Sequence, residues 1–153
     1  MAAGTDVLSM LERTFQLVPG VGAAREKELW ARGIQSWSDF LASKPAGLLI
    51  EPVQEAQEAL ARRDLERISS LVPSREHWRL YPEFADDVVF LDIEADEAQK
   101  PTVVGLLEKG GASVFIAGRN LEDLPRALAQ KRFWVTFDGA AHDVRLLKKR
   151  FRS

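Results

Sequence analysis

Acidic residues follow two short apolar segments of this chain, and their spacing suggests a metal site. Residues 88–91 are apolar and lead into Asp92 and Glu94. Residues two apart on a strand project from the same face, about 6.6 Å apart along the chain, so both carboxylates should face one way. Asp143 follows a second apolar segment, residues 133–137, and we expect it at the start of a helix. Such carboxylates suit a hard divalent cation, Mg²⁺ or Mn²⁺, that serves phosphate chemistry.

The residues around these carboxylates are expected to take a smaller part. Asp96 and Glu97 fall in the loop after the first strand, and we predict solvated side chains there. His142 would be an obvious general base, but adjacent residues on a helix point about 100° apart, so we predict a surface or packed histidine. A carboxyl pair alone could also mark a solvated loop. The neighbouring strands favour the metal site.

Residues 18–22, Val-Pro-Gly-Val-Gly, stand between two expected helices and begin a helix-hairpin-helix signature. Gly20 and Gly22 carry no side chains, so the backbone amides of the turn, that of Val21 included, could approach a phosphate oxygen near the positive end of the next helix dipole. Such contacts would be independent of base sequence. In the alternative interpretation, the glycines only separate two helices, or the module docks onto protein.

The chain has little net charge, but basic residues are concentrated near the C-terminal end of the sequence. A net charge of −2 gives no general case for nucleic-acid binding. Residues 144–153, however, contain five Lys or Arg and no acidic residue. Lys148 and Lys149 are candidate phosphate contacts there, although a solvated helix face that complements the helix dipole explains them equally well. Glu26 and Glu28 lie close to the glycine turn and weaken the prediction of phosphate binding.

Length and composition are typical of a globular protein. The chain has 153 residues, 46% apolar and 29% charged, enough for one domain or for a small module plus part of a larger domain. It contains no cysteine, which excludes disulfides and thiolate zinc sites and allows a reducing compartment. No apolar run approaches the ~20 residues that span a bilayer. We expect a cytoplasmic protein.

Hydrophobic periodicity divides the chain into a helical part and an α/β part. Val7, Leu8 and Leu11 recur at helical spacing, and further helices are predicted over residues 26–32 and 52–68 within a helical module, residues 5–72. A connector and an α/β domain follow, with the order β-β-β-α-β-α. The predicted ranges are the connector 73–87, the domain 88–153, strands 88–93, 102–107, 113–116 and 133–137, and helices 121–130 and 141–151.

The four tryptophans could stack nucleic-acid bases. Each lies within an apolar pattern, however, and the connector is too aromatic for a free linker. We therefore predict core packing for Trp30, Trp37, Trp78 and Trp134.

Taken together, these segments resemble the ribonuclease H-like exonucleases with four acidic catalytic residues, and specifically the YprB-like branch of predicted exonucleases. The resemblance covers nearly the whole chain. It is carried by the helix-hairpin-helix segment and by four later motifs. These segments are residues 18–40, 77–81, 90–94, 135–143 and 146–150.

The resemblance implies 3′→5′ hydrolysis of nucleic-acid phosphodiesters, with DNA favoured over RNA. By that resemblance, Asp92 would bridge two metal ions and Glu94 would bind one of them and orient the attacking water. Asp143 would hold the second ion, directly or through water. Two divalent ions ~4 Å apart can stabilise both the attacking and the leaving oxygen of an in-line displacement.

Relatives of this type continue with a further strand and helices that supply the last acidic ligand and a His or Tyr. We therefore expect a partial ribonuclease H-like domain that lacks its C-terminal part, an incomplete two-metal site and impaired catalysis. A second polypeptide could complete the domain. The alternative is a non-catalytic nucleic-acid-binding or interaction module, in which the glycine hairpin binds and the α/β part is a scaffold.

Overall fold

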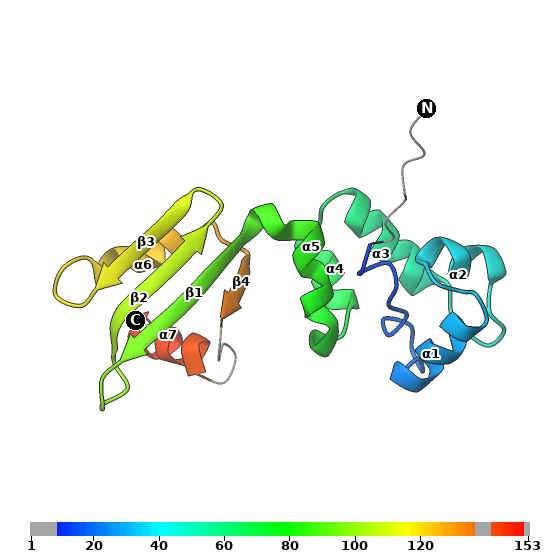
Figure 1. Cartoon of the computed structure of the whole chain (residues 1–153), viewed down its shortest axis with the longest axis horizontal. Helices are drawn as coiled ribbons and strands as arrows, with labels where there is room; N and C mark the ends of the chain where they lie inside the picture. The colour runs from blue at the N-terminus through cyan, green and yellow to red at the C-terminus, as the bar shows by residue number, and fades with distance from the viewer. Residues whose placement is uncertain (1–8, 137–141, 152–153) are drawn as a thin grey trace. The chain divides into compact units, whose positions relative to one another are not determined.

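The computed structural model describes residues 9–136 and 142–151 of the chain (Figure 1). The chain forms two compact units, Met1–Phe84 and Ala85–Ser153. Most of the predicted connector, residues 73–87, therefore belongs to the first unit. Among the helices in the described residues, none combines the length and apolar character needed to cross a bilayer.

The first unit consists of short helices around an apolar core. Phe15, Trp37 and Phe40 are fully buried, and the rings of Phe15 and Phe40 stack with their centroids 5.2 Å apart. A capping box begins one helix, because the Ser36 hydroxyl accepts a hydrogen bond from the Asp39 amide and the Asp39 carboxylate accepts one from the Ser36 amide. The helices are α1 (Ala23–Ala31), α2 (Trp37–Ser43), α3 (Glu51–Ala61), α4 (Leu65–Leu71), the 3-10 helix η1 (Ser74–Leu80) and α5 (Tyr81–Phe84).

The single helix predicted over residues 52–68 is wrong, because α3 and α4 replace it. Arg63 adopts a φ of +53°, a left-handed conformation that ends α3. The Asp64 carboxylate then accepts a hydrogen bond from the Arg67 amide at 3.0 Å and caps α4. Charged and apolar residues alternate on both sides of residues 62–64, so the sequence pattern gave no sign that the helix ends there.

The helix predicted before the glycine turn is absent from the described residues. Residues 10–13 form a turn, while Val7 and Leu8 lie outside the described residues. Leu11 is nevertheless fully buried, and its carbonyl oxygen accepts a hydrogen bond from the Thr14 amide at 3.1 Å. The segment before the glycine turn is therefore fixed by the burial of Leu11 rather than by a helix.

The second unit contains a four-stranded mixed sheet with helices, so the predicted α/β class is confirmed. The strand order is β3-β2-β1-β4, in which β1 pairs antiparallel with β2 and parallel with β4. The elements are η2 (Ala85–Asp87), β1 (Val88–Ala95), β2 (Pro101–Glu108), β3 (Gly111–Ile116), η3 (Leu121–Asp123), α6 (Leu124–Leu128), β4 (Phe133–Thr136) and α7 (Val144–Phe151).

The sheet has one covered face and one open face within the described residues. Along β1, Leu91 and Ile93 are buried, whereas Asp92 and Glu94 are exposed. Side chains of η3, α6 and α7 pack on the covered face. Its core comprises Val89, Leu91, Ile93, Val104, Leu106, Phe115, Leu121, Leu124, Leu128, Leu146 and Leu147.

Candidate metal and nucleic-acid sites

Asp92 and Glu94 lie on the open face of β1, as expected for alternate residues of a strand. Their Cα partners on β2 are Gly105 and Val103. Gly105 leaves the space beside Asp92 empty, since a Cβ built on this glycine meets no atom within 4 Å. In the part of the chain that the structure describes, neither carboxylate has a hydrogen-bond or ion-pair partner. Two uncompensated negative charges therefore face the same side.

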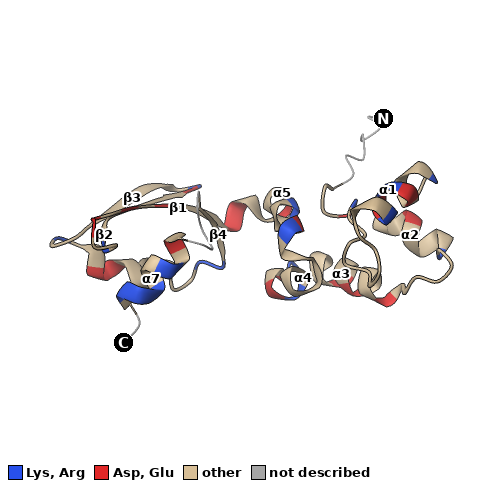
Figure 2. Ribbon diagram, turned by 90° about the horizontal axis from the view of Figure 1, so that it is seen from below, with Lys and Arg blue, Asp and Glu red and all other residues tan. Residues whose placement is uncertain are grey.

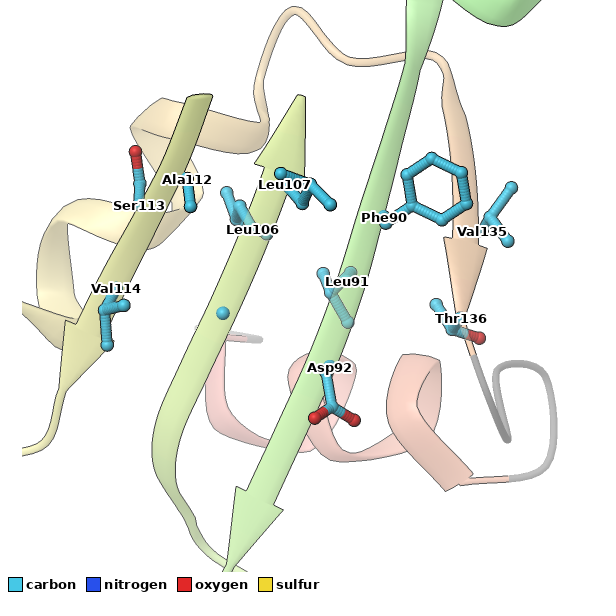
Figure 3. Close-up of a pocket in the computed structure, with 11 residues that line it drawn as sticks. Phe90, Leu91, Asp92, Leu106, Leu107, Ala112, Ser113, Val114, Val135 and Thr136 are labelled. Carbon is cyan, nitrogen blue, oxygen red and sulfur yellow. The ribbon is translucent and has the colours of Figure 1, made fainter. Parts of the chain in front are cut away.

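An apolar groove crosses the open face and leads to Asp92 (Figure 3). The strand register places four apolar side chains in one row across the sheet: Ala112, Leu107, Phe90 and Val135. Asp92 follows Phe90 by two residues on the same face of β1, so one end of the groove is a carboxylate. Its volume of about 780 Å³ lies in the range of small-molecule sites.

Asp143, directly before α7, is buried, with only 4% of its surface exposed. Its one polar contact among the described residues is with His142, whose Nδ1 lies 3.3 Å from Asp143 Oδ1. The other ring nitrogen of His142 lies 3.2 Å from Oε1 of Gln99, in the turn between β1 and β2. His142 therefore ties the start of α7 to that turn. No sequence signal marks Gln99 as its partner.

The structure does not bring the three predicted ligands into one cluster. Among the described residues, no group of three or more His, Cys, Asp or Glu side chains could hold a metal ion. The physical reason is that Asp92 and Glu94 face the open side, whereas Leu146 and Leu147 of α7 pack on the covered side. The Asp92–Glu94 pair still fits Mg²⁺ or Mn²⁺ in kind, because carboxylate oxygens are preferred ligands and no Lys or Arg among the described residues is paired with them.

The glycine turn before α1 is exposed at Gly20 and Gly22 but buried at Val21. Gly20 has a φ of +79°, which disfavours any side chain. Val21 is 4% exposed, and its amide donates to the Val18 carbonyl oxygen at 3.0 Å, so the prediction that Val21 contacts phosphate is corrected. Gly22 caps α1, and Nη1 of Arg25 lies 3.9 Å from the position of a Cβ on Gly20. A guanidinium group therefore stands beside the turn.

Glu26, predicted to weaken phosphate binding at this turn, points into the first unit. It is 2% exposed, and its Oε1 accepts hydrogen bonds from Thr14 Oγ1 and the Phe15 amide, both at 2.8 Å. Its Oε2 accepts one from Gln16 Nε2 at 2.9 Å and lies 3.9 Å from Nη2 of Arg79. The charge of Glu26 is therefore compensated inside the protein.

Lys148 and Lys149 are exposed on α7, while the other side of this helix packs on the sheet. Figure 2 shows the basic stretch in blue. Within the described residues neither lysine has an acidic partner, whereas Arg150 pairs with Glu122. The two lysines are therefore available to phosphate groups, and they also complement the negative end of the helix dipole.

The prediction of core packing is wrong for one tryptophan. Trp37 is fully buried, and Trp30 and Trp134 are half-buried. Trp78, in contrast, is 53% exposed. It lies on η1, whose turns contain three residues rather than 3.6, and this period places it on the outer side of the segment.

No protein-family model, curated protein or solved structure matches the chain.

Proposed function

We propose that this chain is a metal-dependent, exonuclease-like protein that hydrolyses nucleic-acid phosphodiesters from the 3′ end. The observation that carries the proposal is the uncompensated Asp92–Glu94 pair on the open face of β1. Mg²⁺ usually binds proteins through one or two carboxylates and completes its shell with water and substrate phosphate oxygens, so this pair is a sufficient anchor. The strand order β3-β2-β1-β4, with β1 and β4 parallel, supports a ribonuclease H-like arrangement.

Different residues would serve metal binding and the positioning of Asp143. Asp92 and Glu94 would hold the cation, which supplies an activated water and stabilises the charge that develops on the phosphate. Asp143 is oriented by His142, which is itself held by Gln99. Among the described residues Asp143 does not cluster with Asp92 and Glu94, so the proposed metal site rests on that pair alone.

Two groups of residues would bind the nucleic acid without reading its sequence. In the first unit, Gly20 and Gly22 expose the start of α1, and Arg25 adds a positive charge beside them. In the second unit, Lys148 and Lys149 are exposed on α7 and have no acidic partner within the described ranges. DNA is the substrate that we propose first.

A non-catalytic nucleic-acid-binding module is the second candidate. It is favoured by the lack of a metal-holding group of three side chains among the described residues. In this case the glycine turn would bind, and the sheet would serve as a scaffold. The two candidates make opposite predictions for metal dependence.

The test uses 5′-labelled single-stranded DNA, the full chain and Mg²⁺ or Mn²⁺. The exonuclease proposal predicts a ladder of products that shorten from the 3′ end. EDTA, Asp92→Asn and Glu94→Gln should each abolish this ladder. Glu97→Gln is the matched control, because Glu97 is an exposed carboxylate in the loop beyond the strand. Calorimetric titration with Mn²⁺ measures metal binding independently of cleavage.

Intact DNA with normal protein binding in both metals would reject the exonuclease proposal and leave the binding module. A ladder that persists in the Asp92→Asn and Glu94→Gln variants would show that a contaminating nuclease causes it. Loss of the ladder in Glu97→Gln as well would mean that general charge, rather than the strand pair, matters.

A further inference from the structure

One cation and two aromatic rings form an exposed row along η1. In a 3-10 helix, residues three apart lie above one another. Arg75 and Trp78 are one turn apart on η1, and Tyr81, which caps its C-terminal end, follows after another turn. The Arg75 side chain is 63% exposed, Trp78 is 53% exposed and Tyr81 is 41% exposed. Glu76 and Leu80, which are not in this row, are buried.

The Trp78 ring is held in place although it is exposed. The Arg79 guanidinium lies over the ring, 4.6 Å from its centroid. Arg79 is itself fixed by the Glu76 carboxylate at 2.7 Å and by the Met10 carbonyl oxygen at 3.2 Å. A ring that is backed by a cation on one face presents its other face to a planar ligand.

The indole N–H group distinguishes Trp78 from the other tryptophans. Trp30, Trp37 and Trp134 each donate this hydrogen to a backbone carbonyl oxygen, at 2.8 to 3.0 Å. Within the described residues, the corresponding group of Trp78 has no acceptor. The fold thus anchors three indoles and leaves the fourth, in the row, more than half exposed and without an acceptor among the described residues.

Arg75 is positioned to place a charge in line with the rings. Its Nε and Nη2 donate to Gln16 Oε1 at 3.0 and 2.9 Å, and its Nε lies 4.0 Å from Glu76. Gln16 is a neutral acceptor, and Glu76 is shared with Arg79, so part of the Arg75 charge remains uncompensated at the surface. A cation in line with two aromatic rings suits a nucleic-acid strand, whose phosphate groups and planar bases follow one another along the chain.

We propose that Arg75, Trp78 and Tyr81 bind single-stranded nucleic acid, with a phosphate on Arg75 and bases on the two rings. One 3-10 turn advances about 6 Å, whereas stacked bases are ~3.4 Å apart, so the rings accept bases that have been unstacked. Unstacked bases are offered by single strands rather than by duplexes. This site is separate from the carboxylate pair, and its binding does not require cleavage.

The experiment measures fluorescence anisotropy of a labelled oligothymidylate with the full chain in EDTA, which separates binding from metal-dependent cleavage. Trp78→Ala should weaken binding about 5- to 150-fold, the usual range for loss of one base-aromatic stack. Trp78→Phe retains a ring and should bind nearly as the native chain does. Arg75→Gln should weaken binding and reduce its salt dependence, because one phosphate contact is lost.

Two matched controls separate the row from general effects. Leu49→Ala removes a side chain that is 56% exposed on the same unit, and Arg62→Gln removes a cation whose side chain is 65% exposed, at the C-terminal cap of α3. Both should bind as the native chain does. Oligothymidylate should also quench native tryptophan fluorescence more than that of Trp78→Phe.

Binding to Trp78→Ala that equals native binding would overturn the proposal, and so would the absence of any binding to the native chain. Equal affinity for a duplex of the same length would overturn the single-strand part. If the chain binds as proposed but never cleaves, only the exonuclease proposal is lost.

Discussion

Glu26 is the carboxylate whose replacement should most affect the first unit. Its two oxygens accept three hydrogen bonds, from Thr14 Oγ1, the Phe15 amide and Gln16 Nε2, at a position that is 2% exposed. Glu26→Gln keeps the shape but replaces one acceptor oxygen with an NH₂ group. That group would then face a donor, so at least one buried donor loses its acceptor.

The magnitude follows from the number of partners lost. A buried donor without an acceptor costs about 1–3 kcal/mol, and bonds to a charged group lie toward the upper end. The charge opposite Arg79 is also lost, although Arg79 keeps its 2.7 Å contact with Glu76. We expect Glu26→Gln to cost about 2–4 kcal/mol and Glu26→Ala about 3–5 kcal/mol. The Gln variant should lower Tm by roughly 10–25 °C.

The assay is urea and thermal unfolding of the full chain, followed by tryptophan fluorescence, because Trp30, Trp37 and Trp78 all lie in the first unit. Glu28→Gln is the matched control on the same helix, since Glu28 is exposed. Its effect should stay within about 0.5 kcal/mol. The reasoning is refuted if Glu26→Gln unfolds within about 0.5 kcal/mol of Glu28→Gln.

Three further predictions concern stability. Hydrogen bonding, first of all from the Gln35 amide, lowers the pKa of Asp39 below its ordinary value of 3.8, so the ionised carboxylate stabilises the fold above that pH. The difference in urea midpoint between the native chain and Asp39→Asn should therefore shrink as the pH falls below 3.8, and a difference that stays constant would contradict this. Lys44 has a φ of +44°, which glycine adopts without strain. Lys44→Gly should therefore raise the free energy of unfolding by about 0.5–1 kcal/mol in urea titrations, whereas a decrease would show that the lysine side chain contributes to stability. Leu106→Ala should lower the free energy of unfolding by about 2–5 kcal/mol, because Leu106 is 2% exposed. Leu107→Ala should lower it by less than about 0.5 kcal/mol, because Leu107 is 53% exposed. Equal losses for the two variants would refute the assignment of the covered face.

The elements that depend on neighbours in sequence could be predicted. The capping box of Ser36 and Asp39 marks the start of α2 because its hydrogen bonds join residues three apart. The strands of the second unit follow from apolar segments between turn residues, and the observed β1 to β4 lie close to the predicted ranges. Local chemistry determines these features, so a local pattern reveals them.

Features that depend on distant partners could not be predicted. Glu26 is charged and lies on a short helix, so its sequence context suggests an exposed residue, yet partners 10 to 12 residues away bury it. His142 contacts Gln99 across 43 residues. The exposed Trp78 depends on a period of three, which separates it from the apolar residues that surround it in the sequence.

The candidate site shows the same division between local and distant effects. Asp92 and Glu94 share a face because strand alternation requires it, and alternation can be read from the sequence. Whether Asp143 joins them depends on which face of the sheet α7 covers. Residues 88–91 are apolar throughout, so β1 offers an apolar surface on both faces, through Phe90 on one and Leu91 on the other. The sequence therefore predicts the carboxylate pair but not the side on which the helix that follows Asp143 packs.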